Sequence, residues 1–166
     1  MSMEQNNNAP AAYSTEQLLQ ELAEAFEKLI GTPTEAAKRG VTRQGDRWGP
    51  REIIAHLAGW EVMATVRIPR IVAGMPPLEE ADEARQAVMN DAIYATIVTM
   101  IGEQPLSTVC GILRKAYQCD LEKLKQLDDT FFQLGEYVYE RTRSVIAHCQ
   151  EHGQEVTVRR VVKLVK

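Results

Sequence analysis

The chain has 166 residues, of which 45% are hydrophobic and 25% charged, the balance of a soluble globular protein with one ordinary domain. A formal net charge of −4 and a pI near 5.5 argue against nucleic acid or an anionic membrane surface as a partner, since both select a basic face. Cys110, Cys119 and Cys149 are odd in number and lack CxxC spacing, so we expect no disulfide framework and a cytoplasmic location.

The opening residues 1–13 have neither the basic nor the apolar part of a signal peptide, and we interpret them as a flexible leader. Residues 14–166 are then predicted to form a single domain. Ser14 and Gln17 have the spacing of a capping box at the start of a helix over residues 14–30. Gly31 and Pro33 are predicted to stop this helix.

Three further helices are indicated by apolar residues at helical spacing. The second begins near Pro50, which suits a first helical position, and runs to about residue 74, with Pro69 kinking or shortening its last turn. The third covers residues 106–127, and the last begins near Leu134 and extends to about residue 156. The segment 78–105 is either a helix or a short helix inside a long crossover loop.

Four long amphipathic helices joined in part by long connections predict an all-α fold, an up-down four-helix bundle. Such bundles build metal and ligand sites from side chains on facing helices.

The chain contains three histidines, and the pattern predicts that all three face the bundle interior. His148 and His152 are four residues apart, so their imidazoles lie on one helix face, within an apolar stripe. His56 lies between Ile53 and Trp60 on the apolar face of the second helix. A single inward histidine is more often a core residue with one hydrogen-bond partner, but burying three without a shared purpose is costly.

We therefore predict a divalent metal site formed by His56, His148 and His152. Three neutral imidazoles leave a coordination position open, as in catalytic rather than structural sites. Zinc and nickel both accept nitrogen ligands, so the sequence does not choose between them.

The stretch HCQEH at 148–152 also matches the H-x-x-E-H pattern of inverted zinc proteases, with Glu151 as general base. A protease is not expected, because only 14 residues follow His152. Glu151 is interpreted as a solvated carboxylate, and Cys149 as a small buried residue rather than a fourth ligand. Glu61 either pairs with an arginine at the mouth of the bundle or is solvated.

Two segments carry a resemblance to a known family: WGPREIIAHLAGWEVMATVRIPRIVAG at 48–74 and HCQEH at 148–152. They resemble the DinB-like superfamily, and within it the ClbS/DfsB type of four-helix bundle protein. The resemblance rests on Trp48, His56, Leu57, Trp60 and Glu61, together with His148 and His152. It implies a bundle in which one histidine of the second helix and two of the last helix hold a divalent metal.

The resemblance implies a metal-dependent enzyme acting on a small molecule, by transfer of a low-molecular-weight thiol or by hydrolysis of a small electrophile. Two alternatives stay open: a non-catalytic stress or binding bundle stabilised by metal, and a metal-free hydrolase or sequestering protein of the ClbS kind. A homodimer is compatible with such bundles.

Overall fold

The computed structural model describes residues 13–38, 48–76 and 82–158. In these ranges the chain forms five α-helices and one short 3-10 helix, and no strand. The elements are α1 (Thr15–Lys38), α2 (Pro50–Val72), α3 (Glu83–Ile101), α4 (Leu106–Leu124), η1 (Asp129–Phe132) and α5 (Tyr137–Val158).

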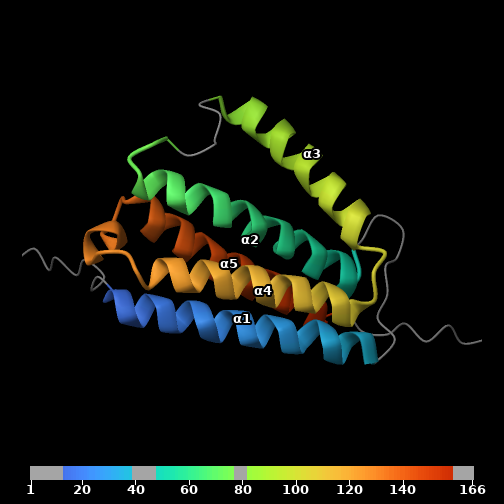
Figure 1. Ribbon diagram of the computed structural model, residues 1–166. Coiled ribbons are helices and arrows are strands. Elements are labelled where there is room, and N and C mark those ends of the chain that lie inside the picture. Colours follow the sequence, from blue (N-terminus) through green and yellow to red (C-terminus); the bar gives the residue numbers. More distant parts are fainter. Residues whose placement is uncertain (1–12, 39–47, 77–81, 159–166) are drawn as a thin grey trace, which may run out of the picture.

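Helices α1, α2, α4 and α5 form the predicted four-helix bundle, in which α1 packs mainly on α5 and α2 mainly on α4 (Figure 1). Helix α3 lies outside the bundle against α2 (Figure 1). It connects the end of α2 to the start of α4 and returns the chain to the end of the bundle at which α2 began (Figure 1). Consequently α1 and α2 run in opposite directions, as do α4 and α5, whereas α2 and α4 run in the same direction (Figure 1).

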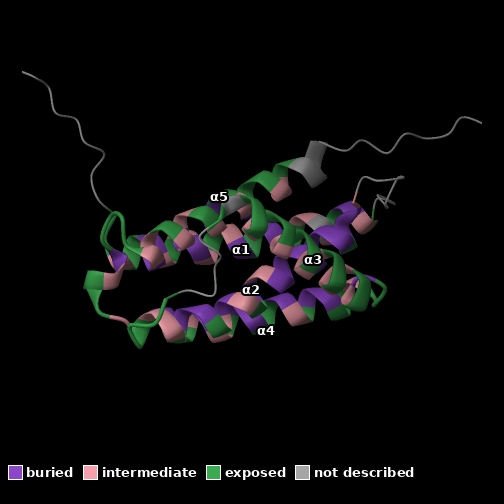
Figure 2. Cartoon of the chain, turned by 90° about the horizontal axis from the view of Figure 1, so that it is seen from above, coloured by how far each residue is buried: buried purple, intermediate pink, exposed green. Residues whose placement is uncertain are grey.

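Each bundle helix turns one apolar stripe inward, as Figure 2 shows by the alternation of buried and exposed residues along its length. The largest fully buried side chains come from all four bundle helices: Leu18, Phe26, Leu29, Ile53, Ile54, Ile68, Val109, Leu113, Leu124, Val138 and Ile146. No helix of the described residues is long and apolar enough to cross a membrane.

The predicted capping box at the start of α1 is present. The Gln17 backbone N–H donates to the Ser14 hydroxyl oxygen at 3.2 Å, and the Ser14 N–H donates to the Gln17 side chain at 3.1 Å.

The predicted end of α1 at Gly31 and Pro33 is wrong, because the helix continues through both residues to Lys38. Beyond the proline, Ala36 is fully buried in the core, and the Thr34 hydroxyl donates to the Ile30 carbonyl at 3.1 Å. Core packing of the extra turn thus outweighs the roughly 3 kcal/mol that a proline costs inside a helix.

The other boundaries follow local signals. Helix α2 begins at Pro50 as predicted, and Gly74, with φ of 69°, follows its end. Segment 78–105 adopts the helical alternative, and its first turn is capped by Asp82, which accepts from the Ala84 and Arg85 N–H groups. The last helix begins three residues later than predicted, because Leu134 is exposed and Gly135 takes a φ of 90°.

Candidate metal centre

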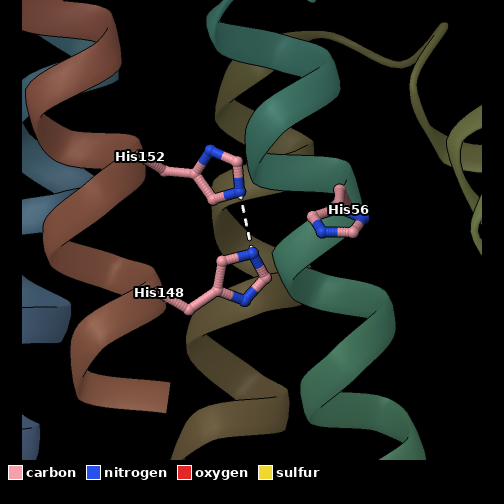
Figure 3. A group of neighbouring side chains, drawn as sticks. All are labelled: His56, His148 and His152. Atoms are coloured by element: carbon pink, nitrogen blue, oxygen red, sulfur yellow. Dashed lines mark hydrogen bonds between the residues drawn. The ribbon is translucent and has the colours of Figure 1, made fainter. Parts of the chain in front are cut away.

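The three histidines come together in the bundle as the sequence predicted. His56 projects from the second turn of α2, and His148 and His152 project from successive turns of α5 towards it (Figure 3). One ring nitrogen from each lies within 4.8 Å of the other two. The Nε2 atoms of His148 and His152 are 2.9 Å apart, and the ring centroids of His56 and His148 are 5.3 Å apart.

Burial keeps His56 and His148 uncharged at neutral pH. Desolvation lowers the pKa of His56 to about 3, and the neighbouring His148 and His152 lower it further. Burial likewise lowers the pKa of His148 to about 4, with His152 adding to the effect and Glu151 opposing it. Neutral imidazoles keep a lone pair on one ring nitrogen, which is the form that binds a metal ion.

The donor set fits a divalent cation. Two nitrogens on one tetrahedral zinc, at bond lengths near 2.0–2.1 Å, lie about 3.4 Å apart, so the observed spacing requires side-chain adjustments of about an ångström. Nδ1 of His56 is buried and has no hydrogen-bond partner among the described residues. A buried nitrogen without a partner is costly.

Aromatic side chains surround His56. The Trp60 indole N–H donates to Nε2 of His56 at 3.3 Å, and the Trp48 ring centroid lies 5.0 Å from that of His56. Tyr94 of α3 completes the enclosure, with ring centroids 4.6 Å from His56 and 4.7 Å from Trp60. Helix α3 therefore covers the α2 side of the histidine cluster.

A cavity of about 320 Å³ opens beside His148. Its lining is mostly apolar and includes Phe26 of α1, Leu57 and Trp60 of α2, and Val145 of α5. This volume suits a small organic molecule, and its contact with His148 places such a molecule next to the histidines.

Four charged residues line the same cavity, Glu61, Arg67, Glu140 and Arg141, and two of them, Glu61 and Arg141, belong to a buried cluster. One guanidinium nitrogen of Arg141, Nη2, lies 3.3 Å from a Glu61 oxygen and 3.3 Å from Oδ2 of Asp120. Glu61 comes from α2, Asp120 from α4 and Arg141 from α5, so the cluster joins three helices. Of the two alternatives for Glu61, the structure shows the pairing with an arginine, and Glu61 is buried rather than solvated.

The remaining predicted candidates take supporting places. Cys149 is buried as expected, and burial raises the pKa of its thiol to about 12, so it is not a thiolate nucleophile at neutral pH. Glu151 is exposed to solvent. Val156, predicted to continue the apolar stripe of the last helix, lies outside the residues whose side chains are described.

Sequence analysis missed Asp120, Arg141 and Tyr94. Asp120 lies three residues after Tyr117 and four before Leu124, both in the core, so its spacing marks it as an inward carboxylate. Arg141 has the same relation to Val138 and Val145. Tyr94 carried no comparable signal, because it lies on the outer helix α3.

Comparisons with known proteins support the fold. No family model matches the chain, and no curated protein does. The structure is similar to a solved structure described as "Sibling Lethal Factor Precursor - DfsB", with a TM-score of 0.70 and 16% sequence identity, over 87% of this chain and 93% of that one. The resemblance to the ClbS/DfsB type is thus confirmed in the fold of the bundle.

Proposed function

We propose that the protein is a cytoplasmic metal-dependent enzyme in which His56, His148 and His152 hold one zinc or nickel ion. The observation that carries the proposal is three neutral imidazoles, with ligand atoms within 4.8 Å, beside a cavity of about 320 Å³. A bound ion would act as a Lewis acid and make a thiol or water nucleophilic at neutral pH.

The protein side chains have three tasks in this proposal. The histidines supply nitrogen ligands, and burial protects His56 and His148 from protonation. The apolar lining of the cavity, including Phe26 and Leu57, holds a small electrophile and limits water. The thiol arrives as a cosubstrate, because the thiol of Cys149 is protonated and enclosed.

The first test is the metal content of untagged protein, measured by inductively coupled plasma mass spectrometry. The parent should hold close to one equivalent after incubation with zinc or nickel, and the His56→Ala and His148→Ala variants much less. Glu151→Gln is the matched control, since this exposed carboxylate lies between two ligand positions and should leave metal content unchanged. A parent protein that binds neither zinc nor nickel would contradict the three-histidine metal site.

The second test is turnover by the metal-loaded protein. Hydrolysis of 4-nitrophenyl acetate, and cysteine addition to 1-chloro-2,4-dinitrobenzene, should exceed the rates with His148→Ala and should stop after chelation. Metal binding without either reaction would favour a non-catalytic, metal-stabilised bundle.

One observation favours a second candidate, a metal-free bundle that sequesters or hydrolyses a small molecule. The fold similarity to DfsB together with the mostly apolar cavity supports this alternative. The metal-free alternative requires that the His56→Ala and His148→Ala variants still bind a ligand in the cavity. The leading proposal requires that the same variants lose turnover.

A further inference from the structure

Glu61 and Arg141 line the cavity that His148 also lines, and Asp120 lies behind them. All three side chains are shielded from water: Glu61 is 3% and Asp120 1% exposed, and the Arg141 side chain is 13% exposed. A charged cluster therefore faces the same space as the histidines.

The charges of this cluster do not balance unless it binds a proton. It contains two carboxylates and one guanidinium, and the same Nη2 atom of Arg141 serves both carboxylates. Glu61 and Asp120 therefore lie next to each other on one guanidinium nitrogen, where a shared proton removes the repulsion between two like charges. With that proton the cluster is neutral.

The surrounding groups favour the shared proton. Burial raises the pKa of Asp120 to about 8, the Glu61 carboxylate raises it as well, and Arg141 and Lys123 oppose the shift. The Lys123 ammonium is partly engaged elsewhere, since it donates to the Thr65 carbonyl at 2.8 Å.

The neighbouring hydroxyl and thiol groups are uncharged at neutral pH, whereas Arg67 of α2 and Glu140 of α5 are charged residues that line the same cavity. From α4, the Tyr117 hydroxyl has its pKa raised to about 12 by burial and by the carboxylates of Glu61 and Glu27. From α5, the thiol of Cys149 is also neutral. Asp120 Oδ1 and the Tyr117 hydroxyl are buried and have no hydrogen-bond partner among the described residues.

Stability alone gives a poor account of this arrangement. Well-packed apolar residues in place of a buried ionic cluster are often as stable or more stable, because desolvating the charges is expensive. Perturbed carboxylates in a cleft are instead typical of groups that transfer protons.

We propose that Glu61 is the general acid of the reaction in this cavity and delivers the proton that it shares with Asp120. Asp120 and Arg141 are positioning residues, which hold the proton and fix the Glu61 carboxyl group. This inference rests on the proposed function and adds the substrate class: an electrophile whose leaving atom is an oxygen that needs a proton, such as an ester.

The step balances without an oxidant or reductant. A water molecule loses one proton to solvent and forms a bond from its oxygen to the ester carbon; an ion held by His56, His148 and His152 would supply Lewis-acid activation for this attack. The bond from that carbon to the leaving oxygen breaks, and its electron pair stays on that oxygen. Glu61 delivers to this oxygen the one proton that it shares with Asp120, and the carboxyl pair then recovers one proton from solvent. The products are the acid and the alcohol.

The test compares two esters in zinc-loaded parent, Glu61→Gln and Asp120→Asn proteins. Phenyl acetate requires a proton for its leaving oxygen, whereas 4-nitrophenolate leaves without one. Glu61→Gln should lower kcat for phenyl acetate by about 10²-fold and leave 4-nitrophenyl acetate nearly unchanged. Asp120→Asn should move the alkaline limb of the pH–kcat profile to lower pH, since Glu61 then faces Arg141 without a second carboxylate.

The matched control is Glu21→Gln, which removes another interhelical carboxylate–arginine pair, Glu21 with Arg143, outside this cavity. It should leave both ester rates unchanged. Zinc content and melting temperature are measured for every variant, so that a loss of metal or fold is separated from a loss of acid catalysis. The two conservative variants each retain one carboxylate against Arg141, which keeps the cluster neutral.

Equal losses for both esters in Glu61→Gln, or no loss for either, would overturn the acid role while leaving the metal enzyme intact. A zinc-loaded parent no faster than His148→Ala on either ester would defeat the proposed reaction and the acid role together. Carboxyl-carbon NMR of the metal-free parent gives an independent readout: the pair should hold one proton at pH 7, and two ionised carboxylates there would contradict the inference.

Discussion

Two polar clusters lie in the apolar bundle, and they differ in whether the protein supplies a counter-charge for them. The Glu61–Asp120–Arg141 cluster contains its own counter-charge, since a guanidinium and one proton neutralise two carboxylates. In the histidine cluster, Nδ1 of His56 has no partner among the described residues. The first cluster thus carries a cation of its own, whereas the second presents three imidazoles to which a cation could bind.

This comparison predicts that removing the internal counter-charge has the largest effect. Arg141→Met leaves two buried carboxylates without a cation and should lower the free energy of unfolding by about 3–5 kcal/mol. Arg143→Met removes a half-exposed partner of Glu21 and should cost no more than about 1 kcal/mol. Urea denaturation at pH 7 measures both, and equal losses would show that the inner cluster is no more dependent on its cation than a surface pair.

The histidine cluster should respond to an added cation instead. Zinc at 100 times its dissociation constant stabilises a protein by about 2.7 kcal/mol, provided that it binds only the folded state. For a chain of this size that corresponds to a rise in melting temperature of roughly 5–10 °C. Differential scanning calorimetry should show this rise for the parent and not for His56→Ala, and equal rises would place the ion elsewhere.

A smaller effect concerns pH. The folded-state pKa of Asp120 is raised to about 8, above its unfolded value, so the folded protein holds a proton that the unfolded chain has lost. Stability should therefore fall as pH rises from 7.5 to 8.5, by up to about 1.4 kcal/mol per pH unit. Below this window the unfolded chain protonates His56 and His148, whose folded-state pKa values are lowered, and that effect has the opposite sign.

Asp120→Asn tests this slope directly. Urea denaturation across pH 7.5–8.5 should give a flatter profile for the variant than for the parent. A parent without the downward slope would mean that Asp120 is ionised in the folded state and that the cluster holds no proton.

The histidine cluster was predictable from sequence because its signal is local. His148 and His152 are one helical turn apart, and His56 has apolar neighbours at helical spacing, so three inward imidazoles follow from periodicity alone. Their meeting across α2 and α5 followed from the bundle. The carboxylate cluster was harder, because Asp120 and Arg141 come from separate helices, and their pairing depends on the rotation of α4 against α5.

Helix ends show the same limit. The capping box of Ser14 and Gln17 is local and was predicted. The helix end expected at Gly31 and Pro33 does not occur, because α1 continues to Lys38 and buries Ala36 in the core. Likewise, Tyr94 was missed because the packing of α3 against α2 is a tertiary contact that the local sequence does not specify. Signals within one helical turn are visible in the sequence, whereas contacts between helices become visible in the structure.

The Trp60 indole N–H donates a hydrogen bond to the His56 ring, and this bond is incompatible with a metal on that ring. If Nε2 binds the ion, its lone pair is no longer available to the indole. If Nδ1 binds, the hydrogen of the neutral ring lies on Nε2, which then cannot accept. Metal binding must therefore break the bond between Trp60 and His56 whichever nitrogen is the ligand.

Trp60→Phe should therefore bind zinc more tightly than the parent, by about fivefold, because the ion no longer competes with a hydrogen bond worth about 1 kcal/mol. Trp48→Phe is the control, since Trp48 packs on the same imidazole and should change the affinity less. In that control protein Trp60 is the remaining tryptophan, so zinc should alter its fluorescence as its N–H loses its acceptor. Unchanged affinity in Trp60→Phe, with unchanged fluorescence in Trp48→Phe, would mean that zinc binds without engaging His56, and the three-histidine centre would then lose its α2 ligand.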